Sequence, residues 1–306
     1  MSFEPVHLDL SRDAHDRLAE RRRDEAWLDQ RWADPATRVL VISGTRLRRG
    51  PGGGPLWVAP DEAPEGVRVL LGERAGVVHF ALLVDGADLP EERDDWVGLR
   101  QVAVDFEDDP VDAPLAFHAI GIAEWHRRTR HCPACGERLE SRESGHVLGC
   151  PGCGVEHFPR MDPAVIMVVT DGEPGTPEER CLLGRGAHWP ERRFSTLAGF
   201  AEPGESLEDA VRREVREETG IEVGAVGWFG NQPWPFPSSL MLGFVARASS
   251  TEITVDDTEL AEARWFTRAQ LREEAGSGAI VLPGHGLSIS RSLVEHWYGG
   301  RLPGSW

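Results

Sequence analysis

Residues 199–221 read GFAEPGESLEDAVRREVREETGI, and this stretch decides the fold of the second half of the chain. Ser206 is typical of a helix N-cap and Gly220 of a helix end, so we expect a helix over residues 206–219. The preceding AGFAEPGE is rich in glycine and predicts a loop that brings backbone groups close to a site. In that loop we expect Glu205 to have a structural role.

The predicted helix carries its acidic residues on an unexpected face. At about 100° per residue, Leu207, Val211 and Val215 form one apolar arc. The carboxylates that continue this inward arc are Glu214, Glu217 and Glu218, whereas the arginines lie on the opposite side. Close like charges repel, and the negative end of the helix dipole adds to the cost. A solvated acidic face would place them oppositely, so we expect a divalent cation, Mg²⁺ or Mn²⁺, to be held here.

The composition limits the possible functions. The chain has 306 residues, 40% of them hydrophobic, and a formal net charge of −18, which is globular but unlike a general DNA-binding protein. Lysine is absent, which excludes a Schiff-base lysine and a phosphate-loop lysine. The first residues lack a signal-peptide core and no long apolar run follows, so we expect a cytoplasmic protein without a membrane span.

The pattern along the chain predicts three domains. Residues 1–130 are expected to form an α+β domain, with strands at 38–47 and 76–86 and a helix at 114–130. Residues 131–157 form a short separate module. Residues 158–306 alternate strand-like runs at 164–170, 239–247 and 262–267 with helices at 206–219 and 287–298, which predicts an α/β domain with a mixed sheet. The isolated Cys181 is expected to be a buried core thiol.

Four cysteines dominate the short module HCPACGERLESRESGHVLGCPGCG, residues 131–154. Cys132 and Cys135 form one pair with two residues between them, and Cys150 and Cys153 form another. Two such turns give a tetrahedral sulfur site, so we expect one structural zinc ion, with iron as the alternative. Four protein ligands leave no open position, and the metal would supply much of the folding energy of so small a module.

The acidic stretch also resembles a known family. It matches the Nudix box at every signature position. Gly199 is followed after five residues by Glu205, and after seven more residues by REVREETGI, which begins at Arg213. Nudix hydrolases cleave a nucleoside diphosphate linked to another moiety, using divalent metals and a water. The resemblance implies an α/β/α sandwich, metal ligation by Glu214 and Glu218, and assistance from Glu217. Either Glu217 or Glu218 could be the general base, and Arg213 would orient a glutamate through an ion pair.

A second stretch, NQPWPFPSSLM at residues 231–241, points to a substrate. Three prolines stiffen the backbone around Trp234 and Phe236, and Gln232 and Ser239 stand beside these rings. Rigid aromatic rings with polar neighbours can stack on and hydrogen-bond to a flat base, although a loop packed on the core is the simpler alternative.

This stretch resembles the signature of the NADH pyrophosphatase subfamily, with Asn231 in place of the usual serine. That subfamily has the same order of N-terminal domain, four-cysteine ribbon and Nudix domain. The resemblance implies a homodimer and further site residues: a backbone metal ligand at Ala198, a metal- and substrate-binding Glu259, and substrate contacts by Arg100, Phe158, Phe200 and Ser290. One departure is Gly145, which stands where some members have a substrate-contacting glutamate.

The expected function is hydrolysis of NADH or NAD⁺ to nicotinamide mononucleotide and AMP, with the NAD cap of RNA as a further substrate. Two alternatives stay open. One is a broader Nudix hydrolase acting on ADP-ribose or another dinucleotide. The other is a non-catalytic zinc-ribbon binding protein, which is disfavoured because every glutamate of the box is present.

Overall fold

The computed structural model describes residues 15–84, 96–103, 112–284 and 288–304. The chain folds into two units. The N-terminal unit runs to Met161 and also takes in Trp234–Ser238, and the C-terminal unit comprises Asp162–Pro233 and the residues from Ser239 onward. The N-terminal unit therefore contains both the segment expected as the first domain and the cysteine module.

Strand β10 (Asp162–Asp171) is the central strand of the C-terminal unit. It pairs in parallel with β14 (Ser239–Ala248) and antiparallel with β11 (Arg180–Gly186) and β12 (Leu197–Phe200). The strand order is β13-β14-β10-β11-β15, where β13 is Val223–Trp234 and β15 is Leu260–Thr267. The sheet is therefore mixed, as the sequence predicts.

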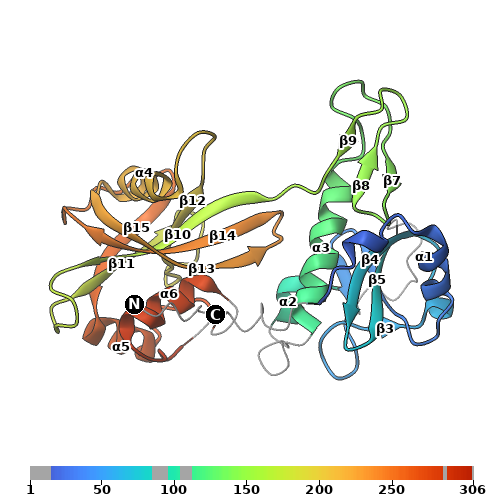
Figure 1. Ribbon diagram of the computed structural model, residues 1–306. Coiled ribbons are helices and arrows are strands. Elements are labelled where there is room, and N and C mark those ends of the chain that lie inside the picture. Colours follow the sequence, from blue (N-terminus) through green and yellow to red (C-terminus); the bar gives the residue numbers. More distant parts are fainter. Residues whose placement is uncertain (1–14, 85–95, 104–111, 285–287, 305–306) are drawn as a thin grey trace. The chain divides into compact units, whose positions relative to one another are not determined.

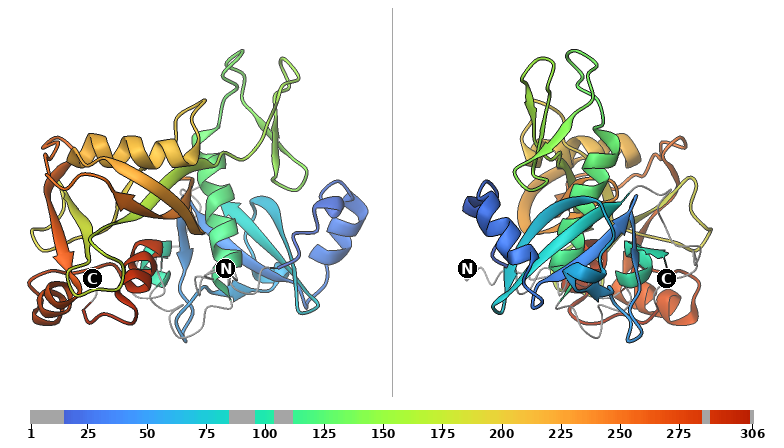
Figure 2. Two further views of the ribbon diagram at one scale, coloured as in Figure 1. Left: turned by 60° about the vertical axis from the view of Figure 1, so that its left-hand side comes forward. Right: turned by 90° about the vertical axis from the view of Figure 1, so that its right-hand side faces the viewer.

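Successive side chains of β10 point to opposite faces of the sheet and build two cores. Val165, Met167 and Val169 pack with the apolar face of α4 (Leu207–Thr219), whereas Ile166 and Val168 belong to the core of the other face. That second core contains residues of α5 (Arg268–Ser277) and α6 (Ile289–Tyr298). Figure 1 and Figure 2 show α4 on one side of this sheet and α5 and α6 on the other. The α/β/α sandwich implied by the Nudix resemblance is confirmed.

The N-terminal unit is built on a second sheet, of order β4-β5-β1-β2-β6, with β3 paired to β1. Its strands are β1 (Arg38–Ser43), β2 (Arg46–Arg48), β3 (Trp57–Val58), β4 (Val67–Arg74), β5 (Val77–Val84) and β6 (Trp96–Gly98). Its helices are α1 (Glu25–Trp32), α2 (Leu99–Ala103) and α3 (Ala113–Arg128), with 3₁₀ turns at Ala19–Arg21 and Pro60–Glu62. Both figures show α3 lying along this sheet, with the cysteine module beyond its C-terminal end.

The cysteine module is a small three-stranded ribbon attached to that sheet. Its strands are β7 (Glu140–Arg142), β8 (Val147–Gly149) and β9 (Glu156–His157). The Leu70 amide of β4 donates to the Ser144 carbonyl, and the His146 ring donates to the Leu70 carbonyl at 2.8 Å. These bonds attach the ribbon firmly to β4.

Most elements expected from the sequence are present, but the structure also contains elements that were not expected, among them α1, β4, β11, β12, β13 and α5. The helices expected at 114–130, 206–219 and 287–298 correspond to elements of the structure, and Cys181 is fully buried as expected. The single strand expected at 38–47 is instead two antiparallel strands, β1 and β2, because the chain turns at Gly44, which has a positive φ. The sequence pattern predicts two helices in the second half of the chain and misses a third, α5. Its signal is the capping box at Thr267 and Gln270, directly after a strand. No helix in the described part of the chain is long and apolar enough to cross a bilayer.

Candidate active site

Helix α4 begins and ends where its sequence indicates. The Ser206 hydroxyl accepts a hydrogen bond from the Asp209 amide, a cap that contributes about 1 kcal/mol. At the other end Gly220 adopts the left-handed conformation, with φ of 69°. The last carbonyls of the helix are satisfied by a distant loop, because the Asp256 amide donates to Glu218 and the Thr254 amide to Thr219. This loop continues to Glu259, which is therefore held near the end of α4.

Glu214 and Glu218 lie on the buried face of α4, as the sequence predicts. The expectation for Glu217 is only partly correct, because its side chain is 53% exposed. Glu217 lies at the edge of the inward arc, where Arg213, one helical turn earlier, binds its carboxylate at 3.0 Å and keeps it at the surface. Two carboxylates therefore face inward and the third stands at the rim.

The carboxylate of Glu214 occupies the space above Gly199 on β12. A Cβ atom at residue 199 would lie 1.9 Å from the Glu214 carboxyl carbon, so only glycine allows this approach. Burial raises the pKa of Glu214, although the Arg213 guanidinium beside it favours the ionised form. The first glycine of the box thus provides the space into which an acidic group fits.

Arg213 connects the loop to the helix. Its guanidinium binds both oxygens of Glu205, at 2.7 and 3.1 Å, and donates to the Phe200 carbonyl at 2.9 Å. It also donates to Glu214 at 2.8 Å. The Arg213 hydrogen bonds lower the pKa of Glu205, and that carboxylate in turn accepts from the Glu202 amide. Glu205 thus orders the loop, which agrees with the structural role expected for it, and Arg213 pairs with glutamates as the resemblance implies.

Glu218 is the most strained acid of this group. Burial raises the pKa of its carboxyl to about 8, with further contributions from the charges of Glu214 and Glu259. Its Oε2 atom is buried and has no hydrogen-bond partner among the described residues. A buried carboxylate oxygen without a partner, next to two further carboxylates, is the environment that a hard divalent cation stabilises. The residues present therefore fit such an ion.

Glu214, Glu218 and Glu259 are nevertheless less tightly gathered than the cysteines. Across the described residues, the four cysteines are the only group with three or more ligand atoms within 4.8 Å of one another. Like-charge repulsion spreads the carboxylates, and Arg213 draws Glu214 toward itself. Ala198, the expected backbone ligand, precedes Gly199 on β12 and pairs with Ile166 of β10.

The sulfur atoms of the ribbon lie much closer together. The Sγ–Sγ distances are 3.6 Å for Cys132 and Cys153 and 3.4 Å for Cys135 and Cys150. Zinc–sulfur bonds of about 2.3 Å in a tetrahedron place the sulfurs roughly 3.8 Å apart, so the group fits a zinc ion. Each pair is closed by a glycine amide that donates to the first cysteine carbonyl, Gly136 to Cys132 and Gly154 to Cys150. Both glycines have the positive φ that such turns require.

The aromatic stretch groups with the N-terminal unit. Trp234 and Phe236 meet edge to face with their centroids 5.0 Å apart. The Arg100 guanidinium of α2 lies 4.7 Å from the Phe236 centroid and 5.7 Å from that of Trp234. Arg100, which is distant in sequence from Trp234 and Phe236, therefore joins them in one cationic and aromatic cluster of residues expected at the substrate.

Comparison with known proteins identifies the domains that carry the two sites. Residues 160–282 match the NUDIX domain and residues 127–158 match the NADH pyrophosphatase zinc ribbon domain. The chain is 37% identical over 308 aligned residues to a protein of Mycobacterium bovis named NAD-capped RNA hydrolase NudC, with 94% of each chain covered. The chain belongs to the NudC-type Nudix hydrolases. A human protein named NAD-capped RNA hydrolase NUDT12 is 44% identical over 197 residues, covering 61% of this chain and 42% of its own.

Two other residues expected at the substrate of this Nudix hydrolase are buried within its own hydrogen-bond network. The Gln232 side-chain oxygen accepts from the Ile289 amide at 2.8 Å. The Ser290 hydroxyl contacts the Ser195 hydroxyl at 2.8 Å and the Thr196 hydroxyl and amide at 3.0 and 3.1 Å. These bonds fix the start of α6 against β13 and the segment before β12, and substrate contact by either residue stays a prediction.

The remaining expected residues differ in exposure. Phe158 and Phe200 are 65% and 57% exposed, which leaves both rings free to meet a ligand or another chain. Ser239 begins β14 and pairs with Asp162, and Glu259 is exposed on its loop.

Sequence reasoning missed the backbone link from Asp256 to Glu218, which holds Glu259 in place. No local motif indicates that link, because it joins segments almost 40 residues apart.

Proposed function

We propose that this Nudix hydrolase cleaves the pyrophosphate bond of NAD⁺ and NADH and removes the NAD cap from the 5′ ends of RNA. The products would be AMP and nicotinamide mononucleotide, in reduced form when NADH is the substrate. The observation that carries the proposal is the buried Glu218 carboxyl beside Glu214 and Glu259, at the end of the Nudix helix. The names of the relatives supply the substrate class.

Each acidic residue has a separate task in this proposal. Glu214, Glu218 and Glu259, with the Ala198 carbonyl, would hold Mg²⁺ or Mn²⁺. When bound, such ions neutralise charge on the diphosphate oxygens and acidify a water molecule. Glu217 or Glu218 accepts the proton of the attacking water. Arg213 keeps the loop and the helix in register through Glu205 and Phe200, so that the acids are positioned before the substrate arrives.

Base recognition is assigned to the aromatic cluster. The Trp234 and Phe236 rings offer flat faces to a nicotinamide or adenine base, and Arg100 beside them offers a cation to the phosphates. Phe158, Phe200, Gln232, Ser239 and Ser290 are the further substrate contacts of the proposal.

We also propose that the enzyme is a cytoplasmic homodimer. The proposal of a dimer follows from the resemblance to the NADH pyrophosphatase subfamily, which implies a homodimer. The oligomeric state can be measured directly by sedimentation of the zinc-loaded protein.

The test is product analysis with NADH, NAD-capped RNA and ADP-ribose in ¹⁸O-labelled water, each with Mg²⁺ and with Mn²⁺. We expect AMP and the mononucleotide from NADH, with the label in one of the two products. Glu218→Gln should lower kcat by on the order of 10³-fold, about 4 kcal/mol, because it removes a charged ligand. Glu208→Gln, an exposed residue in the first turn of the same helix, is the matched control and should keep full activity.

Two outcomes would reject the proposal. Faster turnover of ADP-ribose than of NADH would favour the broader dinucleotide hydrolase. Equal activity in Glu218→Gln and Glu208→Gln would remove the catalytic role of the carboxylates and favour a binding protein.

A further inference from the structure

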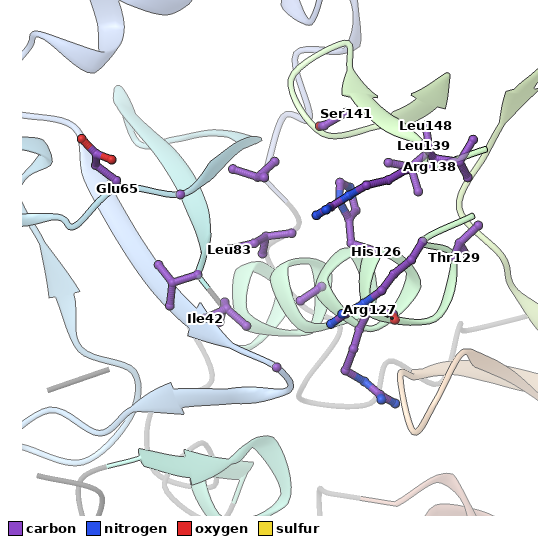
Figure 3. A pocket seen from close by; sticks show the side chains of 16 residues that line it. Ile42, Glu65, Leu83, His126, Arg127, Thr129, Arg138, Leu139, Ser141 and Leu148 are labelled. Atoms are coloured by element: carbon purple, nitrogen blue, oxygen red, sulfur yellow. Dashed lines mark hydrogen bonds between the residues drawn. The ribbon is translucent and has the colours of Figure 1, made fainter. Parts of the chain in front are cut away.

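The N-terminal unit contains a cavity that the proposed reaction does not use. It has a volume of about 470 Å³, within the range of roughly 300–1,000 Å³ typical of small-molecule sites. Its walls come from the N-terminal sheet, the C-terminal turn of α3 and the cysteine ribbon. Figure 3 shows the Arg138 side chain extending from the ribbon into the space between the strands and α3.

One wall of the cavity is apolar. Strands β1 and β5 run parallel, and Ile42 and Leu83, paired near their carboxyl ends, line the cavity together with Leu139 and Leu148 of the ribbon. Ligands of α/β sheets commonly bind at the carboxyl ends of parallel strands, where backbone and loop groups are available. This wall can accept the flat face of a base or the carbons of a sugar.

The other side of the cavity is cationic. Arg127, Arg130 and Arg138 line it, and Glu65 is the single acid among the lining residues. Behind them the buried Glu124 binds both Arg127 and Arg128, so one carboxylate is shared by two guanidinium groups. In the described part of the chain, neither Arg130 nor Arg138 forms an ion pair. A local excess of positive charge on a chain with a net charge of −18 indicates a site for an anion.

The cavity is held in shape before any ligand binds. The His126 ring, which lines it, donates to the Gly145 carbonyl of the ribbon at 2.8 Å. The Leu70 amide donates to the Ser144 carbonyl of the same turn, and Gly145 packs against Val69 of β4. A preformed cavity lowers the ordering cost of binding.

We propose that this cavity is a second nucleotide site, which binds a nucleoside monophosphate through Arg130 and Arg138. The phosphate dianion lies between the two guanidinium groups, and the base lies on the wall formed by Ile42, Leu83 and Leu139. The hydroxyls of Thr129 and Ser141, at the same cavity, are in place to bind the ribose. Both products of the proposed reaction are nucleoside monophosphates, so the choice of AMP and nicotinamide mononucleotide as probes rests on the proposed function.

The experiment is photolabelling of the full-length, zinc-loaded protein with 8-azido-AMP, followed by peptide mapping. Peptide mapping separates this cavity from the catalytic helix, because the two lie on different peptides. We expect label on peptides from residues 126–148 and 38–46, and competition by AMP and by nicotinamide mononucleotide. Arg138→Gln and Arg130→Gln should each raise the concentration for half-maximal labelling by about tenfold, equivalent to about 1.4 kcal/mol.

The matched control is Arg142→Gln. Arg142 is an exposed arginine of the same ribbon that does not line the cavity, so its removal changes the charge equally and should leave labelling unchanged. All three variants should hydrolyse NADH at the wild-type rate, which also shows that they are folded.

Absence of label from the peptides of the cavity, or an equal loss of labelling in Arg142→Gln, would overturn the inference. Competition by inorganic phosphate as strong as that by AMP would also overturn it, because the base would then contribute nothing. Stronger competition by octanoate than by AMP would show that the cavity prefers an apolar carboxylate, and would overturn it too. The proposed function is judged separately by NADH turnover. A protein that labels in the cavity but leaves NADH intact would reject the proposed function while retaining the second site.

Discussion

The sulfur site of the ribbon and the carboxylate site of α4 gather ligands in opposite ways. In the ribbon, two tight turns with glycines at positive φ bring four sulfurs within 4.8 Å of one another. On α4, packing of the helix buries the Glu218 carboxyl, and this burial, with a further contribution from the charges of Glu214 and Glu259, raises its pKa to about 8. The first site has four protein ligands and suits a structural ion, whereas the second leaves the buried Glu218 Oε2 without a partner among the described residues. The two sites thus differ in ligand type: four soft sulfurs from one small module suit zinc, whereas hard carboxylates from a helix and a distant loop suit a hard divalent cation.

The largest effect should come from breaking the sulfur site. Cys150→Ser removes one of four ligands, and zinc binding to such modules is worth on the order of 10 kcal/mol. We expect zinc content to fall from one per chain to almost none, and trypsin to cleave rapidly at Arg138 and Arg142 as the ribbon unfolds. Metal analysis and limited proteolysis measure the two effects.

The control for that experiment is Cys181→Ala. Cys181 lies in the core of the C-terminal unit, so this change should cost some stability but leave the zinc content at one. If the two variants retained equal amounts of zinc, the structural role of the ribbon site would be disproved.

The next effect concerns the strained carboxyl and depends on pH. The folded-state pKa of Glu218 is about 8, above the ordinary 4.5, because burial favours the neutral form. Stability from this group is therefore fully present below pH 4.5 and is lost as the pH rises to 8. The difference between the two pKa values is equivalent to about 4–5 kcal/mol. Without added divalent cations, Glu218→Gln should exceed the wild type in stability by up to about this amount at pH 9, and match it at pH 4.

Urea unfolding at a series of pH values measures this difference. Mg²⁺ should stabilise the wild type at pH 8 and leave Glu218→Gln nearly unchanged, because the cation relieves a repulsion that the amide lacks. A stability difference that is constant from pH 4 to pH 9 would show that burial of the Glu218 charge is not the origin of the strain.

Local patterns in the sequence were sufficient for much of this molecule. The cysteine spacing predicts the ribbon, since the turn chemistry is contained within 24 residues. Helix periodicity predicts the burial of Glu214 and Glu218, because packing follows the apolar arc of α4. Helix α5 escaped prediction because its apolar periodicity is weak and only its capping box at Thr267 and Gln270 marks it.

Long-range contacts could not be predicted in the same way. The exposure of Glu217 depends on an ion pair with Arg213 that also binds Glu205, and periodicity alone does not weigh such a pair. The bonds of Gln232 and Ser290 depend on how α6 docks on the sheet. Likewise, the cavity beside Arg138 exists only because the ribbon packs on β4, which no local pattern indicates.

The smallest effect tests how closely the carboxylate site is fitted to its loop. In Gly199→Ala the new methyl group would overlap the Glu214 carboxylate, which is the mobile end of a side chain and can move aside. We therefore expect little loss of stability but a fall in kcat of about 10²-fold, or about 2.7 kcal/mol, because a displaced ligand no longer holds the cation correctly. Gly227→Ala on β13 is the control, since its added methyl would meet only the Val245 carbonyl at 3.9 Å. Equal kcat values in the two variants would show that the position of Glu214 above Gly199 does not matter for the reaction, and the strained site would then owe its activity to Glu218 and Glu259 alone.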